Sequence, residues 1–209
     1  MRAAGAMACC AAVVLSSCSQ QVGGLAVMPF SERPGPAGVD VDALMLELSQ
    51  MRALTGAGEA LTVIPTMDGK SPVDIDLLAR DVPEPCRFVF AETATFGSRM
   101  TDFHKTTYQS PPDSALISQA AGAYPDAQTA RAAFDSLVQG ASACAETSPG
   151  PILVGDVEVG PDALSTRTST TCGRDYRVKA AVLAEVTFCA FSESVSELVM
   201  VNLLRGVTG

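Results

Sequence analysis

Histidine is nearly absent from this sequence, which limits the chemistry that the chain can perform. His104 is the only imidazole available as a general base or a zinc ligand. No G-x-S-x-G nucleophile motif accompanies it, and no two cysteines after residue 18 have the C-x₂₋₄-C spacing of zinc sites. A hydrolase would need a Ser or Asp beside His104 in a cleft. We predict no catalytic residues, no metal and no cofactor, and therefore a protein that is not an enzyme.

Basic residues are also scarce. The 209 residues contain 14 Lys and Arg against 23 Asp and Glu, a formal net charge of −9. Binding to a phosphate backbone or to an anionic membrane surface depends on clustered Lys and Arg. The composition therefore argues against a nucleic-acid partner and against a polybasic membrane-binding patch.

Apolar runs long enough to cross a membrane, about 20 residues, are missing as well. The uncharged stretch 3–15, which follows Arg2, has the length of a signal-peptide core. It leads into Leu15-Ser16-Ser17-Cys18, which resembles the lipobox of bacterial lipoproteins. The resemblance implies a cleaved lipoprotein signal peptide at 1–17 and diacylglyceryl lipid on the Cys18 thiol. We therefore expect a protein anchored by lipid to the outer, extracytoplasmic face of the cell membrane.

Two alternatives compete with this anchor. Cys9 is preceded by Ala6-Met7-Ala8, which lacks the branched apolar residue and leaves almost no hydrophobic core before the cysteine. An ordinary secretory signal cut nearby would make Cys18 incidental. After Cys18, residues 18–39 contain many Gly and Pro residues and show no hydrophobic period, which is typical of a flexible tether. We expect one folded domain, residues 40–209.

Four cysteines belong to that domain: Cys86, Cys144, Cys172 and Cys189. An even number of cysteines outside the cell favours disulfides, and four cysteines allow three pairings. We favour Cys172–Cys189, which brackets a predicted hairpin, and Cys86–Cys144, which ties the start of the domain to a long helix.

Hydrophobic spacing predicts the regular elements of the domain. Helices are indicated near 40–56, 126–144 and 194–205, and strand-like runs at 98–109, 115–124, 152–159, 163–170, 176–183 and 185–191. Residues 57–85 are rich in Pro, so we expect loops there, with a short helix or turn from Pro83. The order of elements predicts an α+β fold with a mostly antiparallel twisted sheet, packed helices and two disulfides.

Three features together resemble the PknH-like extracellular sensor domain family, which also occurs in stand-alone mycobacterial-type lipoproteins. They are Pro85-Cys86-Arg87, a Tyr-Pro followed by an Ala-rich helix from Tyr124 to Cys144, and the late pair Cys172 and Cys189. The resemblance covers about 40–206. Members typically carry a Trp before the helix cysteine, and this chain has Gly140, Ala141 and Ser142 there. The resemblance implies two disulfides, an antiparallel sheet and a cleft for an unidentified ligand, and no reaction.

Two functional hypotheses follow. The first is a non-catalytic sensor-like domain that binds a small ligand or an envelope component in a cleft. The second is a protein-interaction or structural lipoprotein that docks on a membrane or cell-wall partner. Polar residues of the predicted central strands are our candidates for the cleft lining: Arg99, His104, Tyr108, Tyr176 and Arg177.

Overall fold

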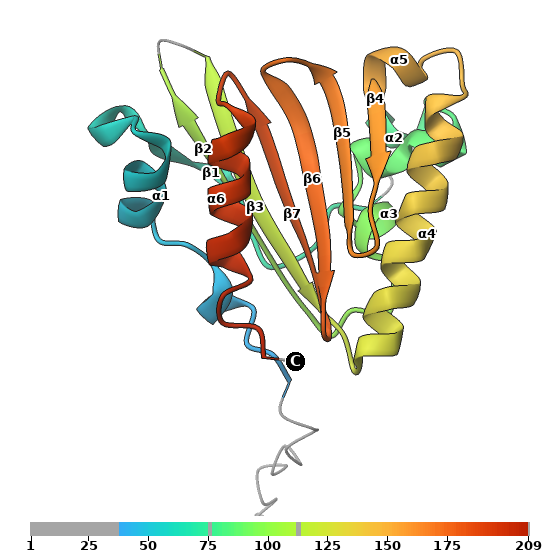
Figure 1. The fold of residues 1–209 in the computed structure, drawn as a ribbon, viewed down its shortest axis with the longest axis horizontal. Helices are drawn as coiled ribbons and strands as arrows, with labels where there is room; N and C mark the ends of the chain where they lie inside the picture. Colours follow the sequence, from blue (N-terminus) through green and yellow to red (C-terminus); the bar gives the residue numbers. More distant parts are fainter. Residues whose placement is uncertain (1–37, 75–76, 112–113, 209) are drawn as a thin grey trace, which may run out of the picture. The chain divides into compact units, whose positions relative to one another are not determined.

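The computed structural model describes residues 38–74, 77–111 and 114–208 (Figure 1). The predicted signal peptide, Cys18 and nearly all of the predicted tether lie outside these ranges. The described residues belong to one compact unit.

A seven-stranded sheet in the order β1-β2-β3-β7-β6-β5-β4 forms the centre of this unit, and every neighbouring pair is antiparallel. The strands are β1 (Thr62–Gly69), β2 (Asp102–Ser110), β3 (Ala115–Ala123), β4 (Asp156–Val159), β5 (Ala163–Ser169), β6 (Cys172–Lys179) and β7 (Val182–Cys189). The chain leaves the sheet after β3, forms helices, and returns as a β4–β7 meander whose last strand pairs with β3. The predicted α+β class with an antiparallel sheet is confirmed.

Both faces of the sheet are apolar. Successive side chains of a strand point to opposite faces, so neighbouring residues of one strand can belong to different clusters. In β7, Val186 and Phe188 belong to one buried cluster and Leu183 belongs to the other. A central strand that is covered on both sides has an almost continuous apolar sequence. This explains why β7 shows no polar alternation.

Helices form a layer on each face. One cluster joins the sheet to the 3-10 helix η1 (Asp42–Leu44), to α1 (Leu48–Thr55) and to α6 (Glu193–Leu203). The other joins it to η3 (Glu84–Val89), α3 (Glu92–Phe96), α4 (Ala127–Ala145) and α5 (Gly150–Leu153). Two short helices, η2 (Gly58–Ala60) and α2 (Leu77–Arg80), complete the elements. No helix in the described ranges is long and apolar enough to cross a membrane.

Side chains at the helix starts explain where two of these helices begin. The carboxylate of Asp126 accepts a hydrogen bond of 2.7 Å from the Thr129 amide at the first turn of α4. That backbone bond holds the pKa of Asp126 below its ordinary value. In α1, Glu47 and Gln50 form a capping box, and Gly56 ends the helix in the left-handed conformation at φ 68°.

Two disulfides cross-link the domain, one between segments far apart in the sequence and one between neighbouring strands. Cys86–Cys144 ties η3 to the C-terminal end of α4, with Cα atoms 4.9 Å apart. Cys172–Cys189 joins residues that face each other across β6 and β7, with Cα atoms 4.1 Å apart. These are the two pairs that the sequence analysis favoured among the three pairings.

Three elements differ from the expectation. The Pro-rich stretch contains a full edge strand, β1, whose pairing with β2 shifts register around Pro65. A Pro lacks the amide needed in a sheet interior but is tolerated at an edge or a bulge. The expected strand 152–159 is instead α5 followed by the short β4. The strands expected at 176–183 and 185–191 both begin earlier than predicted, as β6 and β7, and the turn between them lies at 180–181. Cys172 and Gly173 form the start of β6 instead of a turn before it.

Candidate functional site

Helix α6 lies over the middle of the sheet, as Figure 1 shows. It contacts β3, β7 and β6. The same face of β5 and of the outer half of β6 stays open beside it, and a groove of about 700 Å³ forms there. Ligand sites typically have volumes of roughly 300–1,000 Å³. This groove is therefore large enough for a small molecule.

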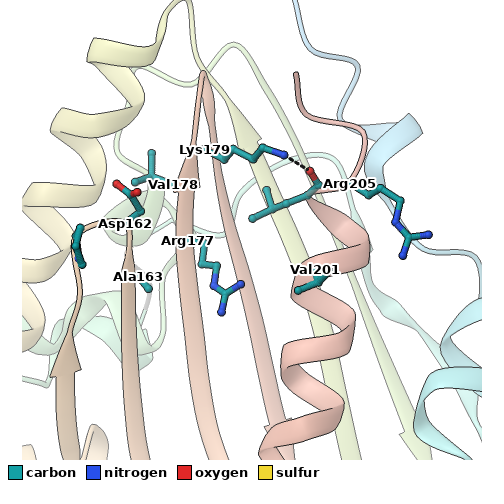
Figure 2. A pocket seen from close by; sticks show the side chains of 9 residues that line it. Asp162, Ala163, Arg177, Val178, Lys179, Val201 and Arg205 are labelled. Carbon is teal, nitrogen blue, oxygen red and sulfur yellow. Dashed lines mark hydrogen bonds between the residues drawn. The ribbon is translucent and has the colours of Figure 1, made fainter. Parts of the chain in front are cut away.

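Three segments far apart in the sequence line the groove (Figure 2). The lining residues are Pro161, Asp162 and Ala163 at the start of β5, Arg177, Val178 and Lys179 in β6, and Val201, Leu204 and Arg205 at the end of α6. Arg177 and Lys179 point to one face because they are two residues apart in a strand. The groove thus combines aliphatic side chains with three cations and one carboxylate.

The charges in the groove are unequally compensated. Arg177 pairs with Glu197 of α6, and Asp162 pairs with Arg131 of α4. Lys179 Nζ donates a hydrogen bond of 3.0 Å to the Leu204 carbonyl oxygen at the end of α6 (Figure 2). Within the described ranges, neither Lys179 nor Arg205 forms an ion pair with a carboxylate.

A second hollow of about 370 Å³ continues the open face toward β4. Arg167 crosses it and is held by Asp175 at 2.6 Å and Glu193 at 2.7 Å, with its guanidinium over the Phe188 ring. Burial opposes the charge of Arg167, but the hydrogen bonds from the two carboxylates outweigh it and raise its pKa. Its charge is therefore already compensated within the chain.

On the opposite face, charged side chains bind one another in the core. Arg174 lies 3.4 Å from the buried Glu185 and donates to the Val89 carbonyl oxygen at 2.8 Å. Glu92 pairs with Lys105 beside a small pocket of about 130 Å³. These contacts hold η3 and α3 against the sheet, so they have a structural role.

His104 occupies a network of its own. Its Nδ1 lies 2.8 Å from Asp42 Oδ1 and its Nε2 lies 3.0 Å from Asp68 Oδ1. Asp42 also pairs with Lys70, and the Thr106 hydroxyl donates to Asp68 at 3.0 Å. Both ring nitrogens of His104 are thus engaged by carboxylates that connect η1, β1 and β2. No group of three or more His, Cys, Asp or Glu residues in the described part of the chain could hold a metal ion.

Comparison with known proteins identifies the domain. The model of the PknH-like extracellular domain family matches residues 36–203. The chain belongs to this family. The crystal structure of the extracellular domain of PknH from Mycobacterium tuberculosis is similar to it, with a TM-score of 0.56 and 17% sequence identity over 78% of this chain and 93% of that chain. At that identity the likeness concerns the fold. A search of curated proteins finds no match.

The structure places the predicted cleft residues of this PknH-like domain apart from one another. Tyr108 is buried, and its hydroxyl donates to the Leu46 carbonyl oxygen at 2.9 Å, so it is a core residue. Burial raises its pKa to about 12. Tyr176 is fully buried on the other face of the sheet, and burial raises the pKa of its phenol. Arg99 is exposed in the turn before β2.

Of the predicted set, Arg177 lines the groove. The predicted residues lie apart for two reasons. Strands β3 and β7 lie between β2 and β6, and the adjacent residues Tyr176 and Arg177 point to opposite faces of the sheet. Sequence reasoning missed Lys179, Val201 and Arg205. Lys179 could have been found from its spacing of two residues from Arg177.

Proposed function

We propose that this protein is a membrane-anchored extracytoplasmic lipoprotein, with lipid on Cys18, whose non-catalytic PknH-like domain binds a small ligand or an envelope component. Membership in an extracellular domain family supports the location. The groove between β6 and α6 is the binding site in this proposal.

One observation carries the choice of site. In a chain with a net charge of −9, the groove contains a cation, Lys179, that forms no ion pair with a carboxylate of the described residues. In the two hollows described above, the cations Arg167 and Lys105 already have carboxylate partners. A concave surface with a few unsatisfied polar groups is the usual form of a ligand site.

The absence of catalysis in this proposal rests on His104. A histidine acts as a general base or nucleophile only through a ring nitrogen that is directed at a reacting group. Both nitrogens of His104 are within hydrogen-bond distance of Asp42 and Asp68. We assign this network the role of joining the start of the domain to the sheet.

The proposed anchor fits the position of the groove. Figure 1 shows that the described chain begins at the end of the sheet where α6 and the C-terminal residues end. Leu204 and Arg205 of the groove belong to that end. The predicted tether of residues 18–39 would therefore join the domain at the end that carries these two residues, and a flexible tether does not fix the direction in which the groove faces.

Native mass spectrometry of the protein purified from its own host tests ligand binding. We expect a mass increment on the wild type and its loss in Val201→Trp, where the indole fills the groove. Leu198→Trp is the matched control, because Leu198 lies on the same helix outside the groove lining. A wild type that is always empty, or a ligand retained by Val201→Trp, would contradict this site.

Metabolic labelling with a fatty acid tests the anchor. The wild type should incorporate label, and Cys18→Ala should lose it and be released from the membrane fraction. Label that persists in Cys18→Ala would show that another residue carries the lipid or that the label is not an anchor.

The second candidate function is docking on an envelope protein. The observation in its favour is the pair of apolar side chains Leu198 and Val201, three residues apart on α6, which are 47% and 44% exposed. Two such residues make a small patch, and single exposed apolar residues are common. Crosslinking in intact cells should trap one reproducible partner that both Leu198→Trp and Val201→Trp abolish, whereas ligand binding depends on Val201 alone.

A further inference from the structure

The groove at α6 has an ionic side and an apolar side. Arg177 and Lys179 extend from β6 on one side, and Val201 extends toward them from α6 (Figure 2). Ala163 of β5 and Leu204 of α6 add aliphatic surface to the same lining. The arrangement matches a ligand with one polar end and one aliphatic part.

Lys179 is the centre of the ionic side. An ammonium group has three donors, and Lys179 uses one of them on the Leu204 carbonyl oxygen. Two donors remain for a ligand. Arg177 lies two residues away in the same strand, with its charge shared by Glu197. The exposed Arg205 side chain extends to the other side of α6, away from Arg177 (Figure 2).

Charge alone would bind an anion weakly at this position. An exposed ion pair changes an affinity by only about one- to fivefold. The net charge of −9 also repels anions from the molecule as a whole. Each buried methylene contributes about fourfold. An anionic ligand that stays in this groove therefore needs aliphatic carbon to cover Val201 and Ala163.

We propose that the groove binds a soluble anionic amphiphile, with its carboxylate or phosphate group at Lys179 and Arg177 and its aliphatic chain along Val201 and Ala163. This inference rests on the proposed function, because it names the chemical class of the ligand for the same site. A protein partner and a membrane surface are the other occupants that the experiment separates.

The experiment measures binding of dodecanoate and dodecyl phosphate by isothermal titration calorimetry, below their micelle concentrations. Dodecyltrimethylammonium has the same chain with the opposite charge, and inorganic phosphate has the charge without a chain. We expect binding of both anionic amphiphiles, at least about 100-fold weaker binding of phosphate, and roughly tenfold or more weaker binding of the cation, which replaces two attractive pairs by repulsion. Equal binding of the cation, or of phosphate, would overturn the proposal.

Variants assign the binding to this groove. Lys179→Met should weaken dodecanoate binding about two- to fivefold, and Lys179→Arg should restore it. Arg80→Met is the control, since Arg80 is an exposed cation on α2, which contacts η3. Val201→Glu should abolish binding, whereas Leu198→Glu, with the same added charge on the same helix, should retain most of it. Unchanged binding in Lys179→Met and Val201→Glu would overturn the assignment.

Sedimentation with phosphatidylglycerol vesicles separates the two sources of an anionic headgroup. The proposal expects free dodecanoate to bind with no requirement for vesicles, and binding to vesicles alone would overturn it in favour of a membrane surface. A different result would refute the ligand class without refuting the proposed function. A host ligand that is lost in Val201→Trp but is neutral or cationic would leave the proposed function intact and refute only the amphiphile.

Discussion

At the scale of the residue, Asp42 illustrates how one carboxylate can connect the start of the domain to the sheet. It pairs with Lys70 and lies 2.8 Å from His104. Its pKa is held below the ordinary value of 3.8, first by the hydrogen bond with Lys70 and also by that with His104. A carboxyl whose pKa is lower in the folded state stabilises the fold above its unfolded pKa. That stabilisation is lost as the pH falls through the folded pKa.

The first prediction concerns the pH dependence of this contact. Asp42→Asn should lower the Tm at pH 5–7, because the charge that binds Lys70 and His104 is gone. The difference from the wild type should shrink as the pH falls below 3.8 and then vanish. Thermal melts across this pH range measure it. Asp135→Asn, an exposed position on α4 with no ion pair in the described ranges, should match the wild type throughout. A difference that is constant with pH would show that charge is not the cause.

The second prediction uses two glycines with the same backbone conformation and different surroundings. Gly155 has φ +60°, and an added Cβ would lie 1.9 Å from the Arg167 carbonyl oxygen. Gly58 has φ +55°, and its added Cβ would meet nothing within 4 Å. Gly58→Ala should cost about 1–2 kcal/mol of strain. Gly155→Ala should cost about 3 kcal/mol or more, because the clash is with backbone. Urea denaturation decides, and equal costs would show that the backbone at β4 adapts.

At the scale of the element, the clearest predictions came from residues whose spacing has one interpretation. The spacing of Phe134, Leu137 and Ala141 predicts the buried face of α4, and all three residues are buried. β1 was missed because Pro65 and its neighbours read as loop, and only the partner strand β2 shows that the segment is an edge. The β6–β7 boundaries shifted because Cys172 and Gly173 resemble turn residues, while the register Cys172↔Cys189 makes them paired.

The two disulfides should contribute unequally, which is the third prediction. Cys86–Cys144 spans 58 residues and Cys172–Cys189 spans 17. In the chain-entropy model, closing these loops is worth about 4 and about 3 kcal/mol. The second pair also joins strands that hydrogen bonds already hold together. The double substitution Cys86→Ala with Cys144→Ala should therefore lower the free energy of unfolding more than Cys172→Ala with Cys189→Ala. Denaturant titration of both variants measures this, and the reverse order would contradict it.

At the scale of the whole molecule, the sequence predicts the fold better than the site. The fold class was predicted from the hydrophobic spacing within each segment, which does not depend on the other segments. The groove depends on β7 pairing with β3, since that places α6 over the middle of the sheet and leaves β5 open. Asp162, Arg177 and Val201 lie in three separate segments of the chain, and no local pattern shows that they meet.

The last prediction locates the beginning of the folding unit. A chain of residues 36–209 retains every residue of the two buried clusters in the described ranges, so it should unfold in urea in one cooperative transition. A chain of residues 48–209 lacks Val41, Leu44 and Leu46, which are buried. It also loses the Leu46 carbonyl oxygen that binds Tyr108 and Gln119 at 2.9 and 2.8 Å. Each apolar side chain contributes about 1.5–3 kcal/mol, and a domain is stable by only about 5–15 kcal/mol. The shortest chain should therefore be largely unfolded by circular dichroism, and a cooperative transition at the wild-type midpoint would show that this segment is not part of the core.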